Sequence, residues 1–107
     1  MPDGHYLVLT TCPPTAARAL AESVLAERLA VCVNILPEVR SIYRWKGAVE
    51  EGQETLLLIK TTAACYPRLE QHVRAHHPYE LPEIIALDVT AGSAAYLAWI
   101  GEHCRPD

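Results

Sequence analysis

Apolar residues follow two different spacings along this chain, and each spacing predicts one type of element. In some segments they form short runs rich in β-branched and aromatic side chains, which indicate strands. In others they recur every three or four positions, as on one face of a helix. Prolines and glycines between the segments mark the turns. The expected strands cover residues 6–11, 31–45, 49–61 and 84–89, and the expected helices cover residues 15–30, 63–76 and 93–103.

The second and third expected strands form a long hairpin around Lys46-Gly47, which marks the turn. Pro37 interrupts the first arm of this hairpin, and a proline inside a strand indicates a sheet edge or a bulge. The second arm is clearest at 54–61 and follows a polar stretch at 50–53, where we expect a kink.

The elements follow one another as strand, helix, strand, strand, helix and strand, with a final helix at the C-terminus. This is the split βαβ order of the ferredoxin-like fold. The sequence therefore predicts an α+β protein, namely a ferredoxin-like βαββαβ sandwich with an extended central hairpin and a C-terminal helix. The chain has 107 residues, the size of one domain covering 1–107.

Three of the expected strands carry apolar side chains on both faces. In the first strand Leu7 and Leu9 face one way while Val8 faces the other, and the third and fourth strands repeat this pattern. The two crossover helices cover only one face of the sheet. Each large aliphatic side chain left in water forgoes about 1.5–3 kcal/mol of burial. We therefore expect identical chains to bury the second face together in a closed, symmetric oligomer.

Charge and composition argue against several classes of partner. The net charge is −4 and the acidic residues are scattered, whereas nucleic acids and anionic membranes attract clustered Lys and Arg. No stretch reaches the ~18 apolar residues of a membrane span, and the first residues lack a signal-like start. We expect a cytoplasmic protein that binds neither nucleic acid nor membrane. Its four cysteines form no CxxC pair, so we expect free thiols.

Cys12, His76 and His77 are the candidate metal ligands. In a ferredoxin-like protomer the end of the first strand lies at the same end of the sheet as the connection between the second helix and the last strand. Thiolate and imidazole ligands suit copper and zinc. The alternative is structural, because His76 shares a helix face with Leu69 and Val73, and a protonated His near a helix C-terminus is favoured by the dipole.

A second group of candidates combines aromatic and charged side chains from the hairpin and from the segment that follows the second helix. In an oligomer they would line a cleft between protomers, a usual place for small ligands. The alternative is that the aromatic members anchor a subunit interface. The group consists of Tyr43, Trp45, Lys60, Tyr79, Glu80 and Glu83.

Catalysis has little support in the sequence, which contains no nucleophile elbow, phosphate-binding loop or HExxH pair. Glu80 and Glu83 flank Pro82 and would be the acid and base of a hydrolase, an interpretation that we rank below salt bridging or capping. We predict that the protein is not an enzyme.

Five ordered segments together resemble one family. They are residues 26–35, 41–47, 58–62, 77–84 and 96–100, with the sequences AERLAVCVNI, SIYRWKG, LIKTT, HPYELPEI and YLAWI. This combination is similar to CutA, the divalent-cation tolerance family. The resemblance implies a homotrimer of ferredoxin-like protomers like that of the PII signalling proteins. It also implies a link to tolerance of copper and other divalent cations, with no required cofactor.

The resemblance further implies a Cys/His metal site near the His76-His77 pair. The cysteine of the family corresponds to Thr10, two residues before Cys12, which is a displacement of about 6.6 Å along a strand. Two functions stay open. The first is a homotrimer that binds copper or another divalent cation in the response to metal ions. The second is a PII-like regulatory or scaffolding trimer that senses a small anionic ligand in the cleft between subunits.

Overall fold

The computed structural model describes residues 4–106 and contains the predicted elements in the predicted order. A short 3-10 helix, η1, takes the place of the expected first turn of the first long helix. The strands are β1 (His5–Cys12), β2 (Cys32–Trp45), β3 (Ala48–Thr62) and β4 (Ile85–Asp88), and the helices are η1 (Pro14–Ala16), α1 (Ala17–Ala26), α2 (Tyr66–His76) and α3 (Ala94–His103).

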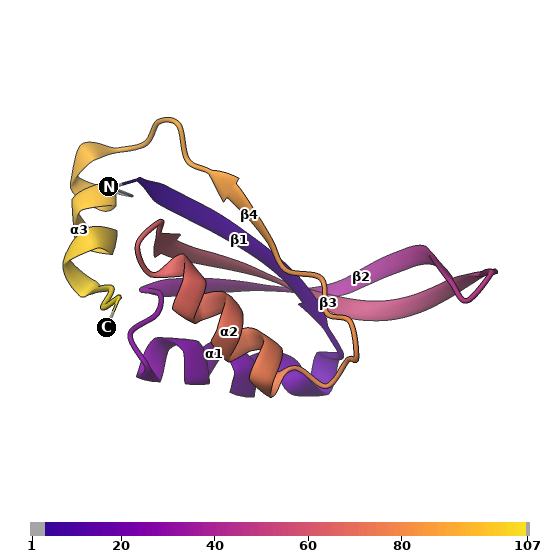
Figure 1. Ribbon diagram of the computed structural model, residues 1–107. Coiled ribbons are helices and arrows are strands. Elements are labelled where there is room, and N and C mark those ends of the chain that lie inside the picture. The colour runs from indigo at the N-terminus through magenta and orange to yellow at the C-terminus, as the bar shows by residue number, and fades with distance from the viewer. Residues whose placement is uncertain (1–3, 107) are drawn as a thin grey trace.

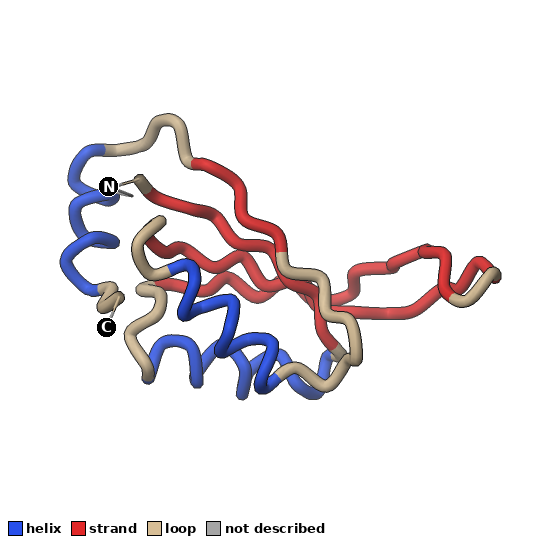
Figure 2. The backbone as a smooth tube through the Cα atoms, viewed as in Figure 1, coloured by secondary structure: helices blue, strands red, loops and turns tan. Residues whose placement is uncertain are grey.

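The four strands form one antiparallel sheet in the order β2-β3-β1-β4. This arrangement confirms the predicted α+β, ferredoxin-like fold. Helices α1 and α2 pack side by side on one face of the sheet, whereas α3 lies at one end, near the start of β1 (Figure 1). The hairpin of β2 and β3 extends well beyond the helices, as expected (Figure 2).

The hydrophobic core lies between the two helices and the sheet face that they cover. Val8 of β1 and the β3 residues Leu57 and Ile59 are fully buried there, against Val24 of α1 and Leu69 of α2. The predicted free thiols are present, since all four cysteines are unpaired and three of them are buried. The apolar spacing of the sequence therefore identified this core correctly.

Helix α1 ends at Ala26, before the predicted end at residue 30. The chain turns at Arg28, whose φ of 58° is left-handed. The N–H of Leu29 donates to the carbonyl of Val24 at 3.2 Å, and the N–H of Arg28 donates to that of Leu25 at 3.0 Å. These two bonds make a Schellman cap. The sequence did not reveal it because the left-handed position of such a cap is usually glycine.

The hairpin is shaped by one tight turn and one bulge. Lys46 and Gly47, with φ of 50° and 82°, form a two-residue turn of the kind that matches the twist of the strands. Next to Pro37 the register shifts and Glu38 has a φ of 63°, so the predicted bulge is confirmed. The kink expected at 50–53 is absent, because these residues pair with β2 without interruption.

Candidate functional site

The sheet face opposite α1 and α2 is open. Leu9 of β1 is the register partner of Ile85 in β4, and Leu7 is the partner of Leu87. Ile85 and Leu87 remain 48% and 46% exposed. The prediction that one chain leaves an apolar second face uncovered is confirmed. Over residues 4–106 no helix is long and apolar enough to cross a membrane.

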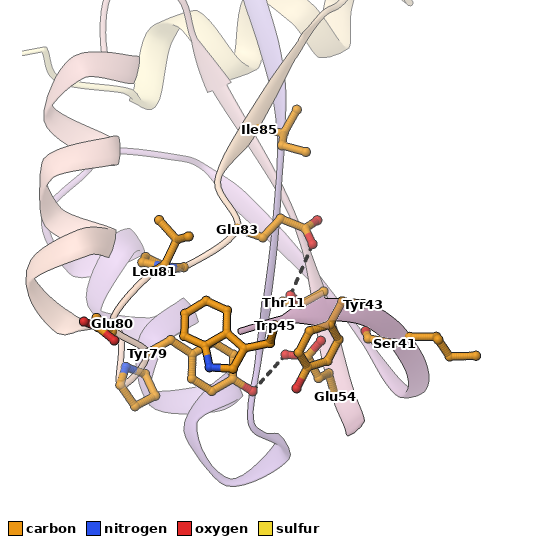
Figure 3. Close-up of a pocket in the computed structure, with 13 residues that line it drawn as sticks. Thr11, Ser41, Tyr43, Trp45, Glu54, Tyr79, Glu80, Leu81, Glu83 and Ile85 are labelled. Carbon is orange, nitrogen blue, oxygen red and sulfur yellow. Dashed lines mark hydrogen bonds between the residues drawn. The ribbon is translucent and has the colours of Figure 1, made fainter. Parts of the chain in front are cut away.

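A pocket of about 880 Å³ lies where the hairpin meets the segment between α2 and β4 (Figure 3). The hairpin supplies Tyr43 and Trp45, and the facing segment supplies Tyr79, Glu80 and Glu83. The antiparallel register brings the base of the hairpin next to the end of β1, where the α2–β4 segment passes. The structure therefore gathers into one pocket most of the residues proposed as a cleft.

The lining of this pocket is acidic. Glu54, Glu80 and Glu83 belong to it, and its described lining residues include no Lys or Arg. Glu54 is only 8% exposed and accepts a hydrogen bond from the Tyr79 hydroxyl at 2.8 Å. Glu83 accepts one from the Thr11 hydroxyl at 3.5 Å. Clustered carboxylates create a negative potential that attracts cations and repels anions.

Tyr79 connects the two walls of the pocket. Its hydroxyl reaches Glu54 on β3, and its backbone belongs to the segment that follows α2 (Figure 3). Burial, followed by the hydrogen bond and the charge of Glu54, raises the pKa of Tyr79 to about 12. The phenol therefore keeps its proton at neutral pH and acts as a hydrogen-bond donor.

Lys60 is not brought to this pocket. It lies on β3 at the open face, where its Nζ donates to Oδ1 of Asn34 and lies 3.8 Å from Sγ of Cys32. In the register of the hairpin Lys60 pairs with Cys32, near one end, whereas Tyr43 pairs with Glu50 near the turn. The length of the hairpin separates Lys60 from the aromatic residues with which the sequence pattern grouped it.

His77 has a structural role in this chain. It is 8% exposed, and its Nε2 donates to the backbone carbonyl of Thr11 at 2.8 Å. Its Nδ1 accepts from the backbone N–H of Tyr79 at 3.1 Å. Both ring nitrogens are therefore engaged, and the ring ties the end of β1 to the segment that carries the pocket residues.

The side chains of His76 and Cys12 lie in different environments, one in solvent and the other in the core. His76 is exposed, and its Nδ1 donates to the backbone carbonyl of His72 at 2.8 Å. Cys12 is fully buried in the main core, and burial, with a smaller effect of the charge of Glu54, raises the pKa of its thiol. Within the described residues no three His, Cys, Asp or Glu side chains are grouped as a metal site. Cys12, His76 and His77 are thus not assembled in one chain.

Sequence reasoning missed two polar residues that the structure makes prominent. Glu54 begins the apolar run of β3. Because every second residue of a strand lies on the same face, Glu54 shares the open face with Leu56 and Leu58, and this spacing was the signal that could have identified it. His72 precedes His76 by one helical turn, a spacing that puts both rings on one face. Neither residue stood out, because each lies in a segment that was interpreted as structural.

Comparison with protein families gives one match that covers most of the chain. The model of the family described as CutA1 divalent ion tolerance protein matches residues 6–103. A divalent-cation tolerance protein CutA of Thermus thermophilus is 50% identical over 98 residues, which are 91% of this chain and 95% of that protein. Human protein CutA is 44% identical over 101 residues, covering 94% of this chain and 56% of the human protein.

The chain spans only about half the length of the human and plant relatives. Protein CutA, chloroplastic, of Arabidopsis thaliana is 46% identical over 84% of this chain and 50% of its own length. Among solved structures, the divalent cation tolerance protein of Thermus thermophilus has a TM-score of 0.92 at 48% identity, with 94% of this chain and 99% of that chain covered. The PII-like protein CutA of Nostoc sp. PCC 7120 has a TM-score of 0.86 at 36% identity, with 92% and 96% covered.

Proposed function

This chain belongs to the CutA1 divalent ion tolerance family, and we propose that it acts as a homotrimer that binds copper or other divalent cations in the response to metal ions. The observation that carries the cation-binding part is the acidic pocket, whose carboxylates Glu54, Glu80 and Glu83 face no Lys or Arg among its described lining residues. Carboxylate oxygens attract divalent cations, and imidazole and thiolate groups favour copper and zinc.

Self-association follows from the open sheet face. Ile85 and Leu87 lie exposed beside Leu7 and Leu9, and the exposed hairpin aromatics Tyr43 and Trp45 extend the apolar surface. Identical chains that share one such face form a closed, symmetric assembly. A trimer is our choice because the family resemblance implies it, and each pocket would then lie beside a neighbouring hairpin.

The ligands of the metal within the assembly are part of the proposal. Cys12, His76 and His77 were selected from the sequence, and of these His76 has an exposed ring. A site built on the other two requires local opening, because Cys12 is buried and both nitrogens of His77 are already bonded. We therefore regard His76 as the first residue to test.

A PII-like role in sensing a small anionic ligand is the second candidate. It is favoured by the structural match to a Nostoc protein that is itself described as PII-like. The acidic lining of the pocket opposes it, because carboxylates repel an anion. Lys60, the one basic residue of the predicted cleft group, lies outside the pocket. The second candidate therefore ranks below cation binding.

We propose a binding protein rather than an enzyme, one that requires no cofactor and works in the cytoplasm without nucleic acid or membrane as partner. Two measurements test the main proposal. Sedimentation at low micromolar concentration should give the mass of a trimer, and calorimetric titration with Cu²⁺ should give saturable binding. A His76→Ala/His77→Ala variant and Cys12→Ser should each weaken that binding. A folded monomer that does not bind Cu²⁺ contradicts the proposal.

A further inference from the structure

A second, smaller core lies at the end of the molecule where α3 is found (Figure 1). Its buried members are Cys65 at the start of α2, Ile100 of α3, and Cys104, which directly follows α3. Cys65 is fully buried and Cys104 is 6% exposed. Two cysteines that are far apart along the chain are therefore gathered in one small cluster, whereas Cys12 belongs to the main core.

The sulfur of Cys104 lies against the turn that leads from β3 into α2. It is 4.0 Å from Oγ1 of Thr61, near the end of β3. The N–H of Cys65 closes this turn by donating to the carbonyl of Thr62 at 3.2 Å and to its hydroxyl at 3.1 Å. Burial raises the pKa of the Cys104 thiol, and the nearby Cys65 thiol raises it further. The two thiols are therefore neighbours, as a disulfide requires.

Two hydrogen bonds hold the chain that follows Cys104. The N–H of Arg105 donates to the carbonyl of Arg28 at 2.8 Å, and a guanidinium N–H of Arg68 donates to the carbonyl of Arg105 at 3.3 Å. The second bond is exposed to solvent, so water can replace it. Local openings that break few contacts occur far more often than global unfolding. Such an opening brings Cys104 to solvent while the main core stays folded.

This opening also controls the reactivity of Cys104, because the thiolate and not the thiol attacks a disulfide. In the closed arrangement the pKa of Cys104 is raised to about 11, so the thiol keeps its proton at neutral pH. After opening, the side chain is in water and ionises at its ordinary pKa of 9.0. The closed arrangement therefore protects the thiol, and each opening makes it reactive.

We propose that Cys65 and Cys104 form an intrachain disulfide when the protein meets an oxidised low-molecular-weight thiol such as glutathione disulfide. The Cys104 thiolate first attacks one sulfur of glutathione disulfide, forms a mixed disulfide and releases one glutathione thiolate. The Cys65 thiolate then attacks the Cys104 sulfur, forms the S–S bond of the protein and releases the second glutathione thiolate. Two protons and two electrons thus pass from the cysteines to one glutathione disulfide, which becomes two molecules of glutathione.

The new bond ties the segment after α3 to the start of α2. In the reduced protein the two thiols act as small apolar groups that fill the second core. A disulfide restricts the unfolded chain, so the oxidised protein should have a Tm higher by about 5 °C or more. The disulfide uses neither the acidic pocket nor a metal ion, so it is independent of the proposed function.

Oxidation of the intact protein by glutathione disulfide, with metal ions removed by a chelator, tests the pair. The single-chain band of a non-reducing gel is digested with trypsin without reductant. It should yield residues 61–68 linked to the peptide that begins at residue 75 and contains Cys104. Cys65→Ala and Cys104→Ala should each lose the linked peptide and the rise in Tm. Cys32→Ala is the matched control and should keep both, because Cys32 lies on β2.

Three results overturn the proposed disulfide. The first is an oxidised, otherwise unchanged protein that yields no linked peptide, a readout that does not depend on any variant. The second is a linkage found only between different chains. The third is a Cys104→Ala variant that keeps the full rise in Tm after oxidation. None of these results affects the Cu²⁺ titration, so the proposed function is tested separately.

Discussion

The Tyr79 hydroxyl donates a hydrogen bond of 2.8 Å to Glu54, and this bond joins the segment after α2 to the base of the hairpin. Glu54 is almost fully buried, so water cannot easily replace the donor. The bond therefore stabilises the fold and also shapes the acidic pocket, since both residues line it.

Removing this donor should destabilise the protein. Tyr79→Phe leaves a buried carboxylate without its partner, and such a loss costs about 1–3 kcal/mol of unfolding free energy. Denaturant-induced unfolding measures the change. Tyr43→Phe is the matched control, because its hydroxyl makes no hydrogen bond within the described chain, and it should stay within about 0.5 kcal/mol of the parent. Equal losses in both variants would contradict the role assigned to the bond.

Alkaline pH should weaken the fold through the same tyrosine. Its pKa is raised from an ordinary value of 10.0 to about 12 in the folded protein. The folded state thus favours the protonated phenol, so this contribution to stability is complete below about pH 10 and is lost as pH rises through about 12.

Ultraviolet difference absorbance should show late ionisation of Tyr79, and also of Tyr66, whose pKa burial raises to about 12. Tyr79→Phe should remove one of these late groups and reduce the loss of stability between about pH 10 and about pH 12. Ionisation of both tyrosines near the ordinary pKa of 10.0 in the folded protein contradicts the prediction.

A charge on the open sheet face should break the assembly. Ile85→Lys places an ammonium group beside Leu9, where a partner chain would have to remove it from water. We expect sedimentation to show a shift towards monomer. Leu25→Lys is the matched control, since Leu25 is also exposed but lies on α1, on the opposite side of the sheet. An unchanged oligomer in Ile85→Lys would show that this face is not the interface.

Glycine at the end of α1 should stabilise the protein. Arg28 adopts a φ of 58°, which costs a residue with a side chain about 1 kcal/mol. Arg28→Gly removes this cost and should raise the unfolding free energy by about that amount, as thermal or denaturant unfolding can measure. Glu27, with a φ of −86°, is the control. Glu27→Gly gains nothing from left-handed freedom and should destabilise instead, by about 0.5–1 kcal/mol.

Local patterns predicted most of the fold because the spacing of apolar residues and the turn residues in each segment agree with the element that the segment forms. The alternation in β3 placed Leu57 and Ile59 in the core, and Lys46-Gly47 formed the expected turn. The predicted end of the first long helix, residue 30, was wrong. Arg28 occupies the left-handed position of a Schellman cap, which normally carries glycine, so nothing in the sequence indicated that the helix ends there.

The candidate sites were predicted less well because their geometry depends on long-range register. Tyr43 and Tyr79 do share a pocket, but Lys60 lies too far along the hairpin to join them. Their chain positions predicted Cys12 and His77 as ligands, but in one chain Cys12 is buried in the core and both ring nitrogens of His77 are hydrogen-bonded. The sequence contained no sign that the His77 ring would bond the Thr11 carbonyl.

The sequence by itself determined the α+β class, the order of elements, the family and the two-sided hydrophobicity of the strands, because these depend on spacing between near neighbours along the chain. Only the tertiary structure decided which polar groups meet. The bond between Tyr79 and Glu54 joins residues 25 positions apart, and that between His72 and Ser23 joins residues 49 apart. Such encounters are set by how the sheet and helices pack, and spacing along the chain does not encode them.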